Sequence, residues 1–333
     1  MGHRSRARRA TTTAALLGAA LTACLAAGCT TTGTGRGPAD DGRAGTSAPA
    51  SPSRSTDAGT GTGPVLAVKI DNAPGARPQT GLDAADVVYA EQVEGGLSRL
   101  MAVYASRLPK VVGPVRSARE SDLELLRQFD RPTLAFSGAQ HKLLPLIDKA
   151  PLRAVTPDET SHAFFRGADK QAPHNLYLRP DRLLPSAPGR AALTAGFHYG
   201  AAPAGGRTET SRTVRYPSAR FTFTWSAGRH RWLVAMDGSP TGTAGGKPVA
   251  PATVVVQYVT VRESAYHDVL GNNTPYTETV GSGKAEVLRD GRAFDATWTR
   301  ATAADGTEFT APDGAPLNFA KGQVWVVFAQ STA

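Results

Sequence analysis

A series of β-rich runs fills residues 201–333 and restricts the fold of this chain more than any other feature of its sequence. The runs either alternate apolar and polar residues, as in "ARFTFTW", or are almost continuously apolar, as in "ATVVVQYVTV" and "QVWVVFA". Such patterns are typical of strands that bury one face or both faces. Between two runs, Asp290 and Gly291 have the composition of a two-residue hairpin turn. The sequence therefore predicts a mostly-β domain over about 201–333.

The region before residue 200 mixes strand patterns with one helical pattern. Its main predicted strands lie at 65–72, 86–93 and 97–106. Further on, "SARESDLELLRQF" spaces its apolar residues as a helix does, and Ser117 with Glu120 has the capping-box spacing that predicts a helix start at Ser117. We therefore expect an α+β protein, with a mixed α/β N-terminal domain over 64–200 and a smaller mostly-β domain after it.

Residues 1–28 have the features of an export signal. Several arginines precede an apolar run that is too short to span a bilayer, and this run ends in "LAAGC". Small residues directly before a cysteine predict a lipobox, with cleavage before Cys29 and acylation of Cys29 by a lipid such as palmitate. An ordinary signal peptide with a chance cysteine, or an uncleaved anchor, is the alternative. We expect a protein anchored by its lipid to the outer face of the cell membrane.

Residues 29–63 offer almost nothing to bury, because Gly, Ser, Thr, Ala and Pro dominate them. Such a composition predicts a disordered tether between the lipid and the folded part. The formal net charge of +9 includes four arginines of the export signal, so the mature chain is near +5 (9 − 4). This excess, in a protein expected outside the cell, does not indicate a nucleic-acid partner.

Two arginines lie in "GPVRSAR", at the expected start of the helix. Arg116 precedes Ser117, and Arg119 would lie in the first turn, where a positive side chain opposes the helix dipole. An anion bound by the unpaired backbone amides and both guanidinium groups would reverse that penalty. The alternative is that both arginines pair with nearby carboxylates, Glu120 and Asp122 among them. Arg116 and Arg119 are therefore candidate ligands of an anion.

Other polar residues are candidates for the same site. "EGGLSR" places Glu94 and Arg99 at the end of a hairpin, and Asp86 lies in a loop next to a strand. "APHNLYL" adds His174 and Asn175. For polar residues in such loops, local hydrogen bonding within turns is the alternative. Since no pair of histidines has the spacing of zinc ligands, the sequence predicts no metal and no cofactor.

The order of these motifs resembles that of the YerB-like bacterial lipoproteins. The resemblance rests on "VKIDNAPGARPQTGLDAADVVYAEQVEGGLSRLMAVY", "GPVRSAR", "APHNLY", "GSGKAEVLRDGRAFDATWTR" and "KGQVWVVF", and it extends from about residue 65 to the C-terminus. It implies two family domains behind a lipoprotein signal, and it implies no catalytic residues. One departure is "SGAQ" at 137–140, where a His-Ala-Gly-Gly-Ser-like segment is expected, so no histidine role is carried over there.

Three functions remain open. We expect a non-catalytic envelope lipoprotein that binds an anionic cell-wall component, or scaffolds an envelope protein, with Arg99, Arg116 and Arg119 holding the anion. The second is an enzyme acting on cell-wall polymers or phosphorylated glycolipids, a phosphotransferase or hydrolase, with Asp86 or Glu94 as base or metal ligand. The third is a purely structural envelope protein. Arginines around an open groove favour binding, whereas arginines consumed in internal salt bridges favour a structural role.

Overall fold

A computed structural model describes residues 63–268 and 270–331 of the chain. The predicted export signal, the lipidation site Cys29 and all but the end of the predicted tether lie outside these residues. Strands dominate the described part of the chain, as predicted for its second half, and helices are few. The mixed α/β character of the 64–200 region stays a prediction.

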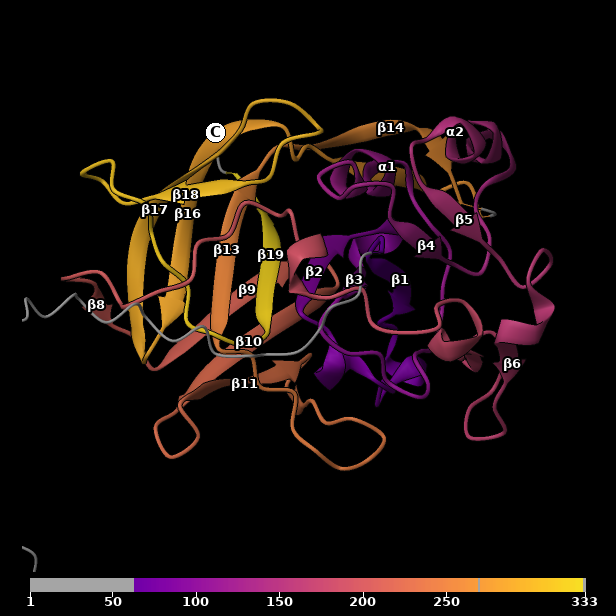
Figure 1. Ribbon diagram of the computed structural model, residues 1–333, viewed down its shortest axis with the longest axis horizontal. Helices are drawn as coiled ribbons and strands as arrows, with labels where there is room; N and C mark the ends of the chain where they lie inside the picture. The colour runs from indigo at the N-terminus through magenta and orange to yellow at the C-terminus, as the bar shows by residue number, and fades with distance from the viewer. Residues whose placement is uncertain (1–62, 269, 332–333) are drawn as a thin grey trace, which may run out of the picture. The chain divides into compact units, whose positions relative to one another are not determined.

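The largest element is an eleven-stranded sheet (Figure 1). Its strands, in spatial order, are β18 (Glu308–Thr310), β17 (Arg292–Arg300), β16 (Gly281–Arg289), β13 (Thr253–Val259), β19 (Val324–Gln330), β2 (Val87–Gln92), β3 (Ser98–Tyr104), β1 (Leu66–Asp71), β4 (Thr133–Ala135) and β5 (Arg153–Val155), with β8 (Arg207–Thr208) beside β17.

The sheet continues across the boundary expected near residue 200. Strand β19 pairs in parallel with β13 on one side and with β2 on the other, where Val324 is opposite Val87. The run "VWVVFA" in β19 is buried on both faces, which is the pattern of a strand in the interior of a sheet. The 64–200 and 201–333 regions are therefore joined by backbone hydrogen bonds.

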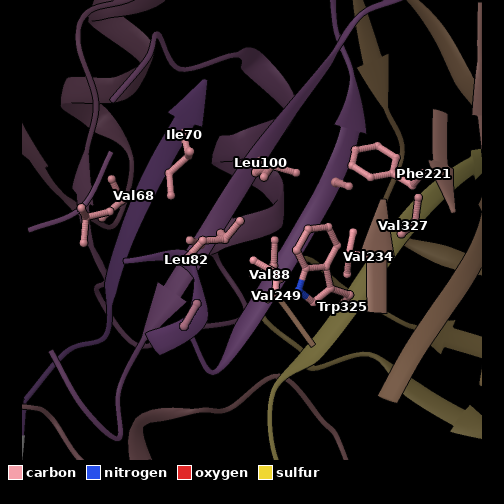
Figure 2. Close-up of a cluster of buried hydrophobic side chains, with 14 of the residues drawn as sticks. Val68, Ile70, Leu82, Val88, Leu100, Phe221, Val234, Val249, Trp325 and Val327 are labelled. Carbon is pink, nitrogen blue, oxygen red and sulfur yellow. The ribbon is translucent and has the colours of Figure 1, made fainter. Parts of the chain in front are cut away.

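Three smaller sheets accompany the large one. The first contains β9 (Ser211–Tyr216), β10 (Ala219–Ser226), β11 (Arg231–Met236) and β12 (Ser239–Pro240), the second β14 (Val261–His267) and β15 (Asn273–Thr277), and the third β6 (Phe164–Arg166) and β7 (Leu176–Leu178). The first of these packs on one face of the large sheet, where Phe221 meets Trp325 edge-to-face at 6.1 Å between ring centroids. Figure 2 shows this core, with Val88, Leu100 and Trp325 of the large sheet and Phe221 and Val234 of the smaller sheet.

The other face of the large sheet carries the two α-helices, α1 (Glu120–Leu126) and α2 (Leu144–Lys149). Short 3₁₀ helices complete the described structure: η1 (Pro74–Ala76), η2 (Leu82–Ala84), η3 (Glu94–Gly96), η4 (His141–Leu143), η5 (Ser161–Ala163), η6 (Pro180–Arg182) and η7 (Arg190–Ala192). Helix α1 buries Leu125 and Leu126 in the core between the helices and the sheet.

The predicted helix start at Ser117 is wrong, because α1 begins at Glu120 with Arg119 as its N-cap. The preceding residues are held in an extended conformation by the sheet. The amide of Arg116 donates to the carbonyl of Lys69 at 2.8 Å, and the amide of Ala118 donates to the carbonyl of Gly138 at 3.0 Å. These backbone groups are thus committed to tertiary hydrogen bonds and cannot form a helical turn.

Two predicted turns are confirmed. Asp290 and Gly291 both have positive φ, 52° and 71°, at the tip of the β16–β17 hairpin, as a type I′ turn requires. At the tip of the β2–β3 hairpin, Gly96 has φ 70°, and a Cβ there would lie 2.6 Å from the Cβ of Pro217. Glycine is therefore required at this position both for its backbone conformation and for the close approach of another segment.

Candidate functional site

Four charged residues share one face of the sheet next to α1. Asp71 on β1 is directly opposite Arg99 on β3, and Arg99 is directly opposite Glu91 on β2. Residues opposite each other in antiparallel strands project to the same face. Lys69 lies two residues before Asp71 and therefore projects to that face as well. The three adjacent strands thus concentrate charge beneath the segment that leads into α1.

Lys69, Glu91 and Asp122 form a buried ionic triad. The Lys69 ammonium is fully buried; it donates to a carboxylate oxygen of Glu91 and, at 2.6 Å, to Oδ1 of Asp122. Ser121 donates its hydroxyl to the other Glu91 oxygen at 3.2 Å. Burial raises the pKa of Glu91 above its usual range, although the neighbouring Lys69 opposes this shift. The triad was not predicted from the sequence. The signal for it was a charged residue among apolar ones, Lys69 in β1 and Glu91 in β2.

Arg119 is held by Glu94 in a bidentate ion pair. Its Nε donates to Glu94 Oε1 at 2.6 Å and its Nη2 to Glu94 Oε2 at 2.7 Å, while the Thr274 hydroxyl also donates to Oε1 at 2.6 Å. Burial raises the pKa of Glu94, but the hydrogen bonds and charge of Arg119 outweigh it and hold this pKa below its usual range. Arg119 therefore forms an internal salt bridge, with Glu94 as its partner in place of the expected Glu120 or Asp122.

Arg116 and His174 share one carboxylate oxygen of Asp71. The distance to Asp71 Oδ2 is 3.2 Å from Arg116 Nε and 2.8 Å from His174 Nδ1. The Asp71 side chain is only 4% exposed, whereas those of Arg116 and His174 are each 28% exposed. The structure thus brings His174 to the arginine cluster through Asp71.

Arg99 has no carboxylate partner within 4.0 Å among the described residues, and its Nη1 donates only to the backbone carbonyl of Ser117, at 3.3 Å. Burial, together with the positive charges of Arg119 and Arg116, lowers the pKa of Arg99 to about 10. The guanidinium is still protonated at neutral pH. Arg99 is therefore a cation whose charge is not compensated by a direct ion pair.

A cavity of about 680 Å³ opens beside these arginines. Its charged lining residues are Arg99, Arg116, Arg119, Glu94, Glu120 and Asp268. We call it the arginine cavity. Arg116 and Ser117 also line a second cavity of about 490 Å³, together with Ser137, Ser161 and Arg166. The structure thus gathers the three predicted arginines and Glu94 around one space large enough for a small molecule.

The other candidates have structural roles. The Asp86 carboxylate accepts hydrogen bonds from the backbone amides of Ala105 and Ser106, both at 2.8 Å, and it lies at the end of β2 away from Glu94. Asp86 does not line the arginine cavity. Asn175 accepts a hydrogen bond from Arg166 at 2.8 Å and donates to the Gly167 carbonyl at 3.0 Å, which holds its own loop together.

Within residues 63–268 and 270–331, no group of three or more His, Cys, Asp or Glu side chains is arranged to hold a metal ion. In the same part of the chain, no helix has the length and apolar character needed to cross a membrane.

Comparisons with known proteins identify relatives along most of the chain. The N-terminal domain of the family described as "Protein of unknown function (DUF3048)" matches residues 51–193, and the C-terminal domain of the same family matches residues 212–326. A Bacillus subtilis protein named "Putative lipoprotein YerB" is 25% identical over 278 residues, covering 78% of this chain and 80% of that protein. The crystal structure of the B. subtilis YerB protein shares the fold, with a TM-score of 0.67 and 21% identity over 80% of this chain and 91% of that chain.

Proposed function

This chain belongs to the YerB-like family, and we propose that it is a lipid-anchored extracytoplasmic lipoprotein that binds an anionic component of the cell envelope in the arginine cavity. The lipoprotein name of the B. subtilis relative and the "LAAGC" segment before Cys29 support the anchor. The membrane is then one partner, through the lipid on Cys29, and the anionic component is the other. No nucleic-acid partner is part of this proposal.

The observation that carries the proposal is the state of Arg99. Glu94 neutralises Arg119. Asp71 neutralises Arg116 only partly, because the same Asp71 oxygen also contacts His174. Arg99 has only a long hydrogen bond to a backbone carbonyl. An anion in the cavity would supply the charge-assisted hydrogen bonds that this guanidinium lacks. It would also offset the burial of Arg99 and its repulsion by Arg119 and Arg116, which lower the pKa of Arg99.

The other two acidic residues of the cavity, Asp268 and Glu120, do not form an ion pair with Arg99. Asp268 is a half-buried residue whose carboxylate accepts hydrogen bonds from the backbone amides of Leu270 and Asn272, at 2.8 Å and 2.9 Å. Glu120 has a raised pKa because of burial, and Arg262 opposes this shift. The positive potential of the cavity is therefore concentrated at Arg99 and at the part of Arg116 that Asp71 leaves uncovered.

An enzyme acting on phosphorylated wall polymers is the second candidate. Asp86 lies outside the cavity, so it cannot serve as a base there. Glu94 lines the cavity, but Arg119 binds both of its oxygens and holds it as a carboxylate with a lowered pKa. A general base needs a free oxygen and a pKa nearer neutrality. These contacts favour a binding module over catalysis.

We further propose that the 64–200 and 201–333 regions are two family domains, the first of mixed α/β type and the second mostly β. The separate matches to residues 51–193 and 212–326 support this division. In this proposal the N-terminal domain supplies the three arginines, and residues 266–268, 270 and 274 of the C-terminal domain complete the wall of the cavity.

The test is binding of inorganic phosphate to the protein, measured by titration calorimetry. We expect Arg99→Ala to weaken binding about 10- to 100-fold, which corresponds to the loss of a charge-assisted hydrogen bond worth about 1.5–3 kcal/mol. Arg215→Ala is the matched control, because Arg215 is an exposed arginine away from the cavity. Equal binding by all three proteins would contradict the proposal.

A further inference from the structure

Two exposed leucines line the arginine cavity. Among the described residues, the large hydrophobic side chains that are exposed are Leu97 (41%), Leu146 (42%), Tyr199 (38%) and Leu270 (83%). Leu97 directly precedes β3, and Leu270 lies between β14 and β15, yet both contribute to the wall of this one cavity. Single exposed leucines are common on protein surfaces, but these two place apolar surface next to the charged residues of one cavity.

The cations and the leucines lie at different depths. The side chains of Arg119 and Arg116 are 13% and 28% exposed, less than those of Leu97 and Leu270. The arginines therefore form the inner part of the cavity, and the two leucines form its mouth, with Tyr266 as a further wall residue. A ligand that matches this arrangement carries its negative charge at one end and an apolar group at the other.

We propose that the arginine cavity binds a phosphate-headed amphiphile, that is, a phosphate group attached to an alkyl chain. This inference rests on the proposed function and adds the chemical class of the ligand. The phosphate lies between Arg99 and Arg116, where guanidinium groups donate charge-assisted hydrogen bonds. The first part of the alkyl chain covers Leu97 and Leu270 and removes their apolar surface from water. Inorganic phosphate would leave most of the 680 Å³ cavity unfilled and both leucines exposed.

The same chemistry is available from two sources, a lipid in the membrane and a free amphiphile. A flexible tether over residues 30–63, as the composition predicts, spans on the order of 30 Å, from about 5–6 Å times the square root of the residue number. An anchored protein with such a tether remains within reach of the lipid surface. The membrane is therefore the source that we expect.

The experiment compares three probes on the full chain carrying Cys29→Ser, which removes the expected acylation site and allows purification without detergent. The probes are inorganic phosphate, dodecyl phosphate below its micelle concentration, and dodecyl maltoside, which has the same chain without the charge. We expect dodecyl phosphate to bind at least 10-fold more tightly than inorganic phosphate. It should also bind at least 10-fold more tightly than dodecyl maltoside. A chain-length series adds butyl phosphate as a fourth probe, and its affinity should fall between those of dodecyl phosphate and inorganic phosphate.

The double variant Leu97→Ser/Leu270→Ser isolates the apolar contribution. It should lose the advantage of dodecyl phosphate while its affinity for inorganic phosphate stays within about 2-fold of the parent. Leu146→Ser is the matched control, because Leu146 is as exposed as Leu97 but lies outside the cavity. The chain-length series on the parent protein tests the same idea without any substitution, so a folding defect in the double variant cannot hide the answer.

The outcomes separate the two proposals. If phosphate binds through Arg99 but dodecyl phosphate binds no more tightly, the amphiphile proposal fails and the anion site stands. If none of the phosphate probes binds, both fail. Flotation with vesicles of phosphatidylcholine, with and without phosphatidic acid, distinguishes the sources. Binding only to the vesicles that contain phosphatidic acid assigns the ligand to the membrane, whereas binding of dodecyl phosphate without flotation assigns it to a free amphiphile.

Discussion

The guanidinium of Arg300 donates to the backbone carbonyl of Glu124, 176 residues earlier in the chain, at 2.9 Å. Arg300 is fully buried, and its other acceptors are the Thr279 hydroxyl and the carbonyls of Leu125, Ala303 and Asp305. Because Glu124 and Leu125 lie in the last turn of α1, these bonds add a donor to carbonyls at the C-terminal end of the helix, which also accept from the Arg127 amide at 3.3 Å and from the Gln128 side chain at 2.7 Å. A positive charge at this end also favours the helix dipole.

We expect Arg300→Met to lower the free energy of unfolding by about 3 kcal/mol, because it removes all the hydrogen bonds by which a fully buried guanidinium joins α1 to the 300–305 segment. Urea unfolding followed by circular dichroism measures the change. Arg292→Met is the matched control: Arg292 also donates to two backbone carbonyls, those of Gly205 and Gly206, but it is exposed. The control should change stability by less than about 0.5 kcal/mol, and a similar loss in both variants would contradict the role of Arg300.

The buried triad predicts a second large effect. Lys69→Met should lower the free energy of unfolding by about 3–5 kcal/mol, because it leaves the carboxylates of Glu91 and Asp122 buried without their counter-ion. Adding Glu91→Gln and Asp122→Asn to Lys69→Met should recover part of the loss, since the triple variant buries no charge in this position. Urea unfolding of the single and triple variants provides the comparison. A triple variant that is less stable than Lys69→Met would show that charge burial is not the cause.

The ion pair between Glu94 and Arg119 predicts a dependence of stability on pH. The pKa of Glu94 in the folded protein is below its reference value of 4.5, so the carboxylate stabilises the fold above pH 4.5, and this contribution is lost as the pH falls through the folded pKa. The stability difference between the parent and Glu94→Gln should therefore be constant near pH 6 and shrink as the pH falls below 4.5. Thermal unfolding of both proteins at a series of pH values measures this difference. A difference that grows as the pH falls would contradict the prediction.

The two glycines at the tip of the β2–β3 hairpin form a matched pair. Gly95 and Gly96 have similar positive φ values, 66° and 70°, but a Cβ at Gly95 would meet nothing within 4 Å, whereas one at Gly96 would lie 2.6 Å from the Cβ of Pro217. Gly95→Ala should cost about 1 kcal/mol for backbone strain alone. Gly96→Ala should cost about 1–3 kcal/mol more, because Pro217 must move. Thermal unfolding of both variants tests this, and equal losses would mean that the contact with Pro217 relaxes freely.

Sequence patterns correctly predicted those turns and strands that are determined by their own neighbouring residues. The hairpin turn at Asp290 and Gly291 follows from its own two residues, and the strands near residues 65–72 and 86–93 follow from runs of apolar residues. The start of α1 could not be predicted in this way. Ser117 and Glu120 have capping-box spacing, but tertiary hydrogen bonds to the Lys69 and Gly138 carbonyls hold the chain extended up to Ala118.

The residues of the candidate site were predicted from the sequence, but the ion pairs among them were not. The motifs supplied Arg99, Arg116, Arg119 and Glu94, which the fold gathers around one cavity. Which arginine is neutralised depends on contacts over long sequence separations, such as the bond from Thr274 to Glu94. Spacing along the chain carries no information on such contacts.

The position of β19 has a consequence for the order of folding. This strand lies between β13 and β2, and it follows both of them in the chain. During synthesis the ribosome completes both neighbours before it makes the strand that bridges them. The large sheet therefore cannot close before residues 324–330 have been made, and until then β13 and β2 each have an unpaired edge.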